Sequence, residues 1–127
     1  NQQFIYSLRR MLDPIKEHVD NNFNPLPTEY INEFMPIRQK INDLMKMSCE
    51  QIETSRYENY REILAEADAC KDELSVLRKK HIDRLQNMKD NTLMQISLVY
   101  LNVLQESQEF LSVMRHQLRA AKKFMEN

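Results

Sequence analysis

The chain has 127 residues, 42% of them hydrophobic and 29% charged, with a net charge of −1, which is the size and composition of one globular domain. It contains no glycine, and this excludes phosphate-cradling loops, dinucleotide-binding turns and tight type I′ hairpins in their usual form. The near-zero net charge leaves no electrostatic footprint for nucleic acid or an anionic membrane surface. All four prolines lie within the first 36 residues, so the other 91 residues contain neither helix breaker, and we predict an all-α protein.

Cysteine spacing and hydropathy indicate the compartment. Cys49 and Cys70 are 21 residues apart, which is too long a spacing for a CxxC redox or zinc motif. Two cysteines are also too few for a disulfide framework, so we expect a reduced, cytoplasmic setting. The longest apolar run covers residues 98–101, far short of the roughly 20 residues that a membrane-spanning helix needs, so direct membrane insertion is not expected. The sequence starts at Asn1 with neither an initiator methionine nor a signal peptide, and we expect a piece of a longer protein.

Two helices are predicted in the first 54 residues. Apolar residues three and four apart predict a helix over 1–23, which Asp13-Pro14 either kinks or divides into two short helices. The sequence NNFNPLPT at 21–28 predicts a loop, because its prolines favour extended backbone. A second helix is predicted over 28–54, with a kink at Pro36.

Capping patterns define two further long helices. Ser55 and Glu58 fit the S-x-x-E capping box, which predicts a third helix over 56–88. Its apolar residues recur at alternating spacings of three and four, as packing in an antiparallel bundle requires. Thr92 and Gln95 offer a second capping box and predict a fourth helix over 91–125.

The first half of the fourth predicted helix is uncharged and strongly apolar. Residues 91–105 contain no charge, and nine of the twelve residues at 93–104 are apolar, so this helix should be buried on more than one side. We predict that it is the central helix of the bundle or faces a partner, and that Leu101 lies in the bundle centre. The predicted fold is an antiparallel up-and-down bundle in one domain over 1–127, with three long helices over 28–127 and an N-terminal helix at 1–23.

Carboxylates one helical turn apart are the candidate metal ligands. Asp68 and Asp72 are four residues apart and could share a divalent cation through oxygen ligands, with Glu106 and Glu109 on the fourth helix as further donors. The alternative interpretation is a solvent-exposed helix face. The sequence alone does not say whether the two helices bring these carboxylates together. The same spacing occurs earlier on the third helix, at Glu62 and Glu66.

No group of residues in the sequence suggests catalysis. The three histidines lack metal-ligand spacing, and His81 is predicted to be a hydrogen-bonded interface histidine. The basic clusters at 78–80 and 115–123 lie toward helix C-termini, where cations complement the helix dipole. Serines and both cysteines lie in helical stretches without a strained turn or an oxyanion site, so an enzyme is not expected.

Three stretches resemble a known family: EHVDNNFNPL (17–26), KDELSVLRKKHIDRLQN (71–87) and SLVYLNVLQESQEFLSVMRHQLRAAKKF (97–124). They are similar to the cytoplasmic C-terminal PhoU-like domain of bacterial sodium/phosphate cotransporters, and the similarity extends over most of the chain. The resemblance implies a parent protein with an N-terminal membrane transporter for sodium and phosphate. It also implies that this helical domain lies at the cytoplasmic face of the inner membrane and regulates phosphate transport through protein contacts.

The same resemblance bears on the metal ligands. PhoU proteins can carry metal clusters on acidic E/D-x-x-x-D motifs, and Asp68-x-x-x-Asp72 matches that pattern. The last helix has Gln105-x-x-x-Glu109 where the family pattern has an acidic pair, so one ligand is missing. A weak single-ion site at Asp68, Asp72 and Glu109, or no site, is therefore expected, and no other cofactor.

Two alternatives need no connection with phosphate. One is an oligomerising helical scaffold whose partner is a second copy of itself, and the other is a divalent-metal-binding bundle that uses Asp68, Asp72 and Glu109. The scaffold should melt at a temperature that depends on protein concentration. The metal bundle should be stabilised by divalent ions and lose that stabilisation on Asp72→Asn.

Overall fold

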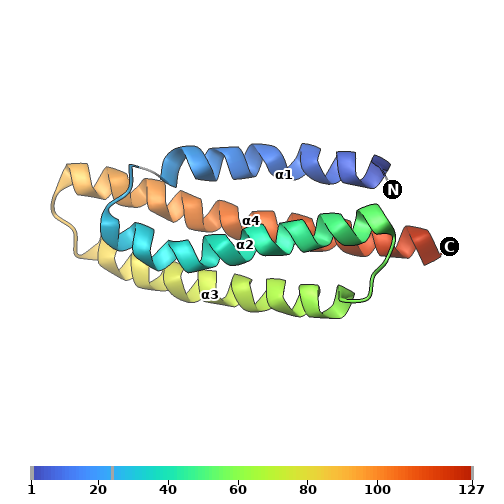
Figure 1. Ribbon diagram of the computed structural model, residues 1–127. Helices are drawn as coiled ribbons and strands as arrows, with labels where there is room; N and C mark the ends of the chain where they lie inside the picture. The colour runs from blue at the N-terminus through green and yellow to red at the C-terminus, as the bar shows by residue number, and fades with distance from the viewer. Residues whose placement is uncertain (1, 24, 127) are drawn as a thin grey trace.

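The computed structural model describes residues 2–23 and 25–126. Over these residues the chain forms four helices and no strand: α1 (Gln2–Phe23), α2 (Thr28–Thr54), α3 (Tyr60–Gln86) and α4 (Asn91–Glu126) (Figure 1). The all-α prediction is confirmed. Pro14 and Pro36 both lie inside continuous helices, so the first predicted helix is not divided in two.

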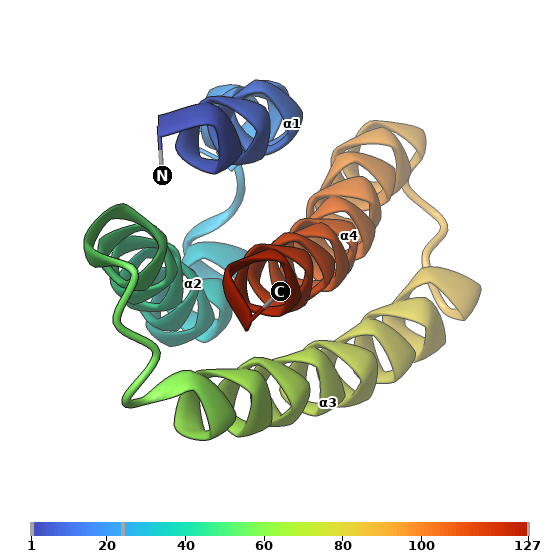
Figure 2. The same ribbon diagram turned by 90° about the vertical axis from the view of Figure 1, so that its right-hand side faces the viewer.

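Consecutive helices run antiparallel (Figure 1), and side-chain hydrogen bonds join neighbouring helices. Asp20 on α1 accepts a hydrogen bond from Arg38 on α2 at 2.7 Å, and Gln108 on α4 donates one to Ser75 on α3 at 2.8 Å. α4 packs against all three other helices, whereas α1 and α3 do not pack against each other. Figure 2 shows α4 between α1 and α3, with α2 beside it. The prediction that the fourth helix is the central one is confirmed.

The core is a single cluster to which every helix contributes. Helical spacing of three and four residues puts the apolar side chains of each helix on one face, and that face is the one the other helices cover. α4 supplies more of the core than any other helix, in keeping with its central position. Its completely buried side chains include Tyr100, Leu104, Leu111, Met114 and Leu118.

The position of Leu101 differs from the prediction. Leu101 is half-buried at the edge of the bundle, while its neighbours Tyr100 and Leu104 are completely buried. Leu101 shares its helix face with Gln105 and Ser112, which are exposed although α1 runs beside α4 at that level. This face of α4 is turned away from the other three helices.

The two predicted capping boxes are both wrong in detail. Ser55 ends α2 and does not begin α3: it adopts the left-handed conformation (φ 55°), and the N–H of Arg56 donates to the carbonyl of Gln51 at 3.2 Å. This is the closure in which glycine is usual, and this chain has no glycine. α3 starts at Tyr60, four residues later than predicted. α4 is capped by Asp90, whose carboxylate accepts the N–H of Leu93 at 3.0 Å.

Candidate functional site

Ion pairs hold α2 and α3 together along half of their shared length. All of them join a residue of α2 to a residue of α3 in one antiparallel register, and they occupy the end of the bundle near the α3–α4 turn. The pairs are Lys40–Glu73 (2.8 Å), Glu33–Lys80 (3.2 Å), Glu33–Arg84 and Glu29–Arg84 (3.4 Å).

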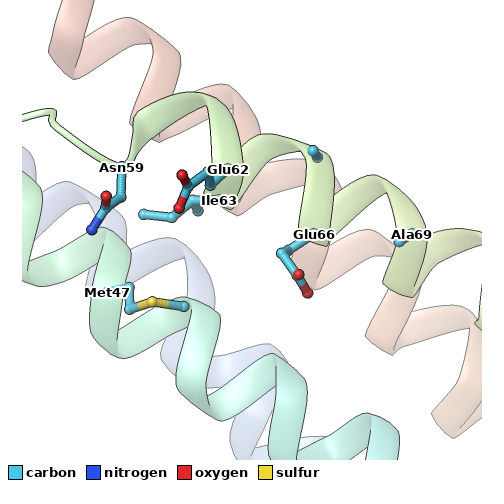
Figure 3. A pocket seen from close by; sticks show the side chains of 7 residues that line it. Met47, Asn59, Glu62, Ile63, Glu66 and Ala69 are labelled. Carbon is cyan, nitrogen blue, oxygen red and sulfur yellow. The ribbon is translucent and has the colours of Figure 1, made fainter.

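Toward the other end of the bundle the same register gives Glu62 and Glu66 of α3 no ion-pair partner among the described residues of α2. It places Glu66 opposite Met47 and Glu62 opposite Gln51. Here the helices leave a surface groove of about 470 Å³. In Figure 3 the Met47 side chain lies across the groove from the carboxylates of Glu62 and Glu66. We call this hollow the acidic groove; it is lined by Met47, Asn59, Glu62, Ile63, Ala65, Glu66 and Ala69.

A second hollow, of about 280 Å³, adjoins the acidic groove and shares Met47 and Asn59 with it. Gln51 lines this hollow and is only 8% exposed. Its amide oxygen is buried and accepts no hydrogen bond from any residue that the structure describes. A buried acceptor without a donor is unfavourable, so this side chain costs the fold some stability.

At the opposite end of the bundle, aromatic and polar side chains from three helices form a buried cluster. Tyr30 on α2 stacks on Tyr100 of α4 at 4.6 Å between ring centres, and His81 on α3 makes a T-shaped contact with both rings. The Tyr30 hydroxyl and the hydroxyl of Ser97 are 2.8 Å apart, and His81 Nε2 lies 2.7 Å from the Ser97 carbonyl oxygen. The prediction that His81 is a hydrogen-bonded interface histidine is confirmed.

Glu33 joins this buried cluster to the α2–α3 ion pairs. Its carboxylate accepts hydrogen bonds from Arg84, Lys80 and the Tyr100 hydroxyl. Burial alone would raise the pKa of Glu33, but these hydrogen bonds and the Arg84 charge outweigh it and hold the pKa below its ordinary value of 4.5. Burial, together with the Glu33 charge, raises the pKa of the Tyr100 hydroxyl. Glu33 is therefore ionised and Tyr100 neutral near pH 7.

His81 is a neutral donor in this cluster. A carbonyl oxygen only accepts, so Nε2 must carry the proton that bonds to Ser97, and Nδ1 is the unprotonated nitrogen. Nδ1 is buried and has no hydrogen-bond partner among the described residues. Burial lowers the pKa of His81 below its ordinary value of 6.5, with Arg84 acting in the same direction, although Ser97, Glu33 and Glu29 favour the charged form.

This arrangement predicts a specific pH dependence of stability. Because the folded chain binds the His81 proton less readily than the unfolded chain, its contribution is fully present above about pH 6.5 and is lost as the pH falls through the folded-state pKa. His81→Gln retains a donor for Ser97 but does not titrate. Urea unfolding at about pH 7.5 and pH 5.5 should show a larger fall in unfolding free energy for the native chain than for His81→Gln. Equal falls would contradict this role of His81.

The predicted metal ligands do not form a recognisable site. Asp68 pairs with Arg115 of α4 at 3.1 Å, and Asp72 and Glu109 are exposed. Over residues 2–23 and 25–126 no three His, Cys, Asp or Glu side chains lie in an arrangement that could hold a metal ion. Glu106 pairs instead with His18 of α1 at 2.6 Å. Metal binding at Asp68, Asp72 and Glu109 stays a prediction.

The cysteine thiols are poor nucleophiles in this structure. Both are free. Burial raises the pKa of the Cys49 thiol, and burial together with Glu73 raises the pKa of the Cys70 thiol to about 11. Because the thiolate is the reactive form, both side chains act as small apolar groups near neutral pH.

The first turns of α4 carry an apolar surface on the side that is turned away from the other described helices. Met94, Leu98 and Leu101 recur at spacings of four and three and lie on the outer side of its first turns, with Leu98 47% exposed and the other two half-buried. We call these three residues the open face of α4. They belong to the uncharged stretch at 91–105. One side of this stretch lies in the bundle core, as predicted for a central helix, and the other side is the open face, where a partner could bind.

Comparisons with protein-family models, curated proteins and solved structures give no match to this chain. None of the four helices is long and apolar enough, over the described residues, to cross a membrane.

Sequence reasoning did not find the acidic groove. It identified Glu62 and Glu66 only as two carboxylates one turn apart. The groove depends on the register between α2 and α3, which decides that Glu73 meets Lys40 while Glu66 meets Met47. An alternation of acidic and basic residues along the facing sides of 29–40 and 73–84, absent at 47–51 and 62–66, was the available signal.

Proposed function

We propose that this chain is a cytoplasmic, PhoU-like regulatory domain of a bacterial sodium/phosphate cotransporter, without catalytic activity of its own. In this proposal it modulates phosphate transport through contacts between its helices and the membrane-embedded part of the transporter. The proposal is supported by the stretches at 71–87 and 97–124, which resemble that family and make up most of α3 and α4.

The observation that carries the proposal is the open face of α4. Large exposed apolar side chains that lie together mark interaction sites more often than scattered ones do. Leu98 is 47% exposed within 15 consecutive uncharged residues, so a partner that covers this face loses no solvation of charged groups. Apolar burial of that kind stabilises a contact by roughly 25 cal/mol per Å².

Sodium-dependent phosphate uptake is the direct test. The membrane portion of a sodium/phosphate cotransporter that lacks its own helical domain is assayed in vesicles with and without this chain. The native chain should change the initial uptake rate, and Leu98→Glu should abolish that effect. Val76→Glu, at a 70% exposed position on α3, is the matched control and should behave like the native chain.

Two results would count against the proposal. Uptake that is indifferent to the native chain would remove the regulatory role and leave the oligomerising scaffold as the better description. An effect that survives Leu98→Glu would retain regulation but exclude the open face as its contact surface.

A further inference from the structure

The acidic groove carries negative charge, and none of its lining residues is a cation. Glu62 and Glu66 are exposed and form no ion pair with any other described residue, unlike Glu73, which meets Lys40 on the same side of α3. The floor of the acidic groove is apolar and is formed by Met47 and Ile63 with two alanines (Figure 3). These features suit a basic segment that also carries apolar side chains.

The last three turns of α4 have that composition. Residues 115–126 include four basic residues and one acidic residue. Arg119 and Lys123 are exposed and form no ion pair within the described part of the chain, and they line a surface hollow next to Tyr60. Phe124 and Met125 are 58% and 45% exposed. We call Arg119, Lys123, Phe124 and Met125 the basic end of α4.

The acidic groove and the basic end of α4 carry opposite charges, although the net charge of the whole chain is only −1. In the acidic groove, Glu62 and Glu66 carry two negative charges that no described cation pairs with. In the basic end of α4, Arg119 and Lys123 carry two positive charges that are unpaired within the described residues. Opposite charge of equal size on two surfaces of one chain favours contacts between copies and steers them into register.

The two surfaces lie at the same end of the bundle but on different sides of α3. Arg115 and Lys122 hold α4 against one side, through Asp68 and the Tyr60 ring. The acidic groove is on the other side, facing α2 (Figure 2 shows α2 and α4 on either side of α3 at this end). The basic end of α4 therefore cannot reach the groove of its own chain.

We propose that the acidic groove binds the basic end of α4 of a second copy of this chain. Because each copy offers both surfaces at one end, two copies related by a two-fold axis satisfy both contacts at once, and the assembly closes as a dimer. Arg119 and Lys123 of one copy face Glu62 and Glu66 of the other, and exposed apolar side chains meet the floor at Met47. This contact does not depend on the transporter assignment, since oligomeric state and phosphate uptake report on different surfaces.

Sedimentation equilibrium of the whole chain tests this contact. At an ionic strength of about 0.01 M, where charges act over about 30 Å, the native chain should be a dimer, and at about 1 M, where the range is about 3 Å, it should dissociate. The double variants Glu62→Lys/Glu66→Lys and Arg119→Glu/Lys123→Glu should each be monomeric at low salt. An equimolar mixture of the two should recover a dimer, because the native groove then meets the native basic end and the two charge-reversed surfaces are complementary to each other as well.

The controls make each outcome decisive. All four substituted side chains are exposed, so circular dichroism should show unchanged helix content. Asp72→Lys/Asp83→Lys makes the same charge change at exposed positions of α3 outside the groove and should remain dimeric. A native chain that is monomeric at low salt would overturn the proposal and leave the groove to a basic segment of another protein. Dimers that persist in both charge-reversed variants, or a mixture that stays monomeric, would overturn it as well.

Discussion

Leu104→Ala is expected to lower the free energy of unfolding by about 2–5 kcal/mol, because it removes a completely buried side chain from the bundle core. Leu104 lies on the side of α4 that faces the other helices, next to Tyr100 in the core. The rings of Tyr30 and Phe34 already hold Tyr100 in place from α2. Tyr100 therefore has little freedom to fill the cavity, and the loss should lie well above that of a surface change.

Leu98→Ala is the matched control for that experiment. It is the same substitution on the same helix, at a side chain that is 47% exposed, and it should change the unfolding free energy by less than about 0.5 kcal/mol. Urea unfolding of both variants, extrapolated linearly to water, gives the comparison. Equal losses would contradict the distinction between the core side and the open face of α4.

The existence and order of the helices could be predicted because they depend on local patterns. Apolar spacing of three and four residues and the absence of glycine identify each helix, and the prolines at 25 and 27 separate the first two. The predicted helix 28–54 has the bounds of α2, Thr28–Thr54, and the predicted start at 91 is the start of α4. The starts of α2 and α4 are set by the residues that directly precede them, Pro27 and Asp90.

The start of α3 could not be predicted from the same kind of pattern. Serine is favourable as an N-cap, so Ser55 with Glu58 looks like the beginning of a helix. In the structure Ser55 instead adopts a positive φ and closes α2. A local motif does not show whether the preceding helix still needs its final carbonyls paired, and in a chain without glycine a polar residue takes that role.

The open face of α4 and the acidic groove both depend on how the helices pack against one another, which the sequence does not show directly. The uncharged stretch at 91–105 is visible in the sequence, but which of its sides stays open depends on how the other three helices pack around α4. That is why Tyr100 is buried and Leu101 is only half-buried. The acidic groove likewise follows from which residue of α2 meets each glutamate of α3. Register is a property of packing, and the i, i+4 spacing of Glu62 and Glu66 is the same whether a lysine or a methionine lies opposite.

Arg84→Met is expected to lower the unfolding free energy by roughly 1.5–3 kcal/mol, the range for losing a hydrogen bond to a charged group that stays buried. The Glu33 side chain is only 15% exposed, so it cannot replace the guanidinium with water freely. The substitution also removes the cation that lies 4.9 Å from the centre of the Tyr30 ring. Methionine retains an apolar side chain of similar length, so the loss reports mainly on charge and hydrogen bonding.

Lys80→Met is the control, because it removes a second cation from the same carboxylate. The Lys80 side chain is 61% exposed and its ammonium lies 3.2 Å from Glu33, and exposed pairs of this kind contribute about 0–1 kcal/mol. A loss as large for Lys80→Met as for Arg84→Met would show that the two cations hold Glu33 equally and that burial of Arg84 adds nothing.

The acid dependence of Arg84→Met follows from the same carboxylate. In the native chain the pKa of Glu33 is below 4.5, so its ion pairs add stability that is present above about pH 4.5 and is lost as the pH falls through the folded-state pKa. Without Arg84, burial, which raises the pKa of Glu33, is opposed only by Lys80 and Tyr100. The stability difference between the native chain and Arg84→Met should therefore be larger at about pH 7 than at about pH 3. A difference that does not change with pH would place the effect of Arg84 in its packing against Tyr30 and not in its charge.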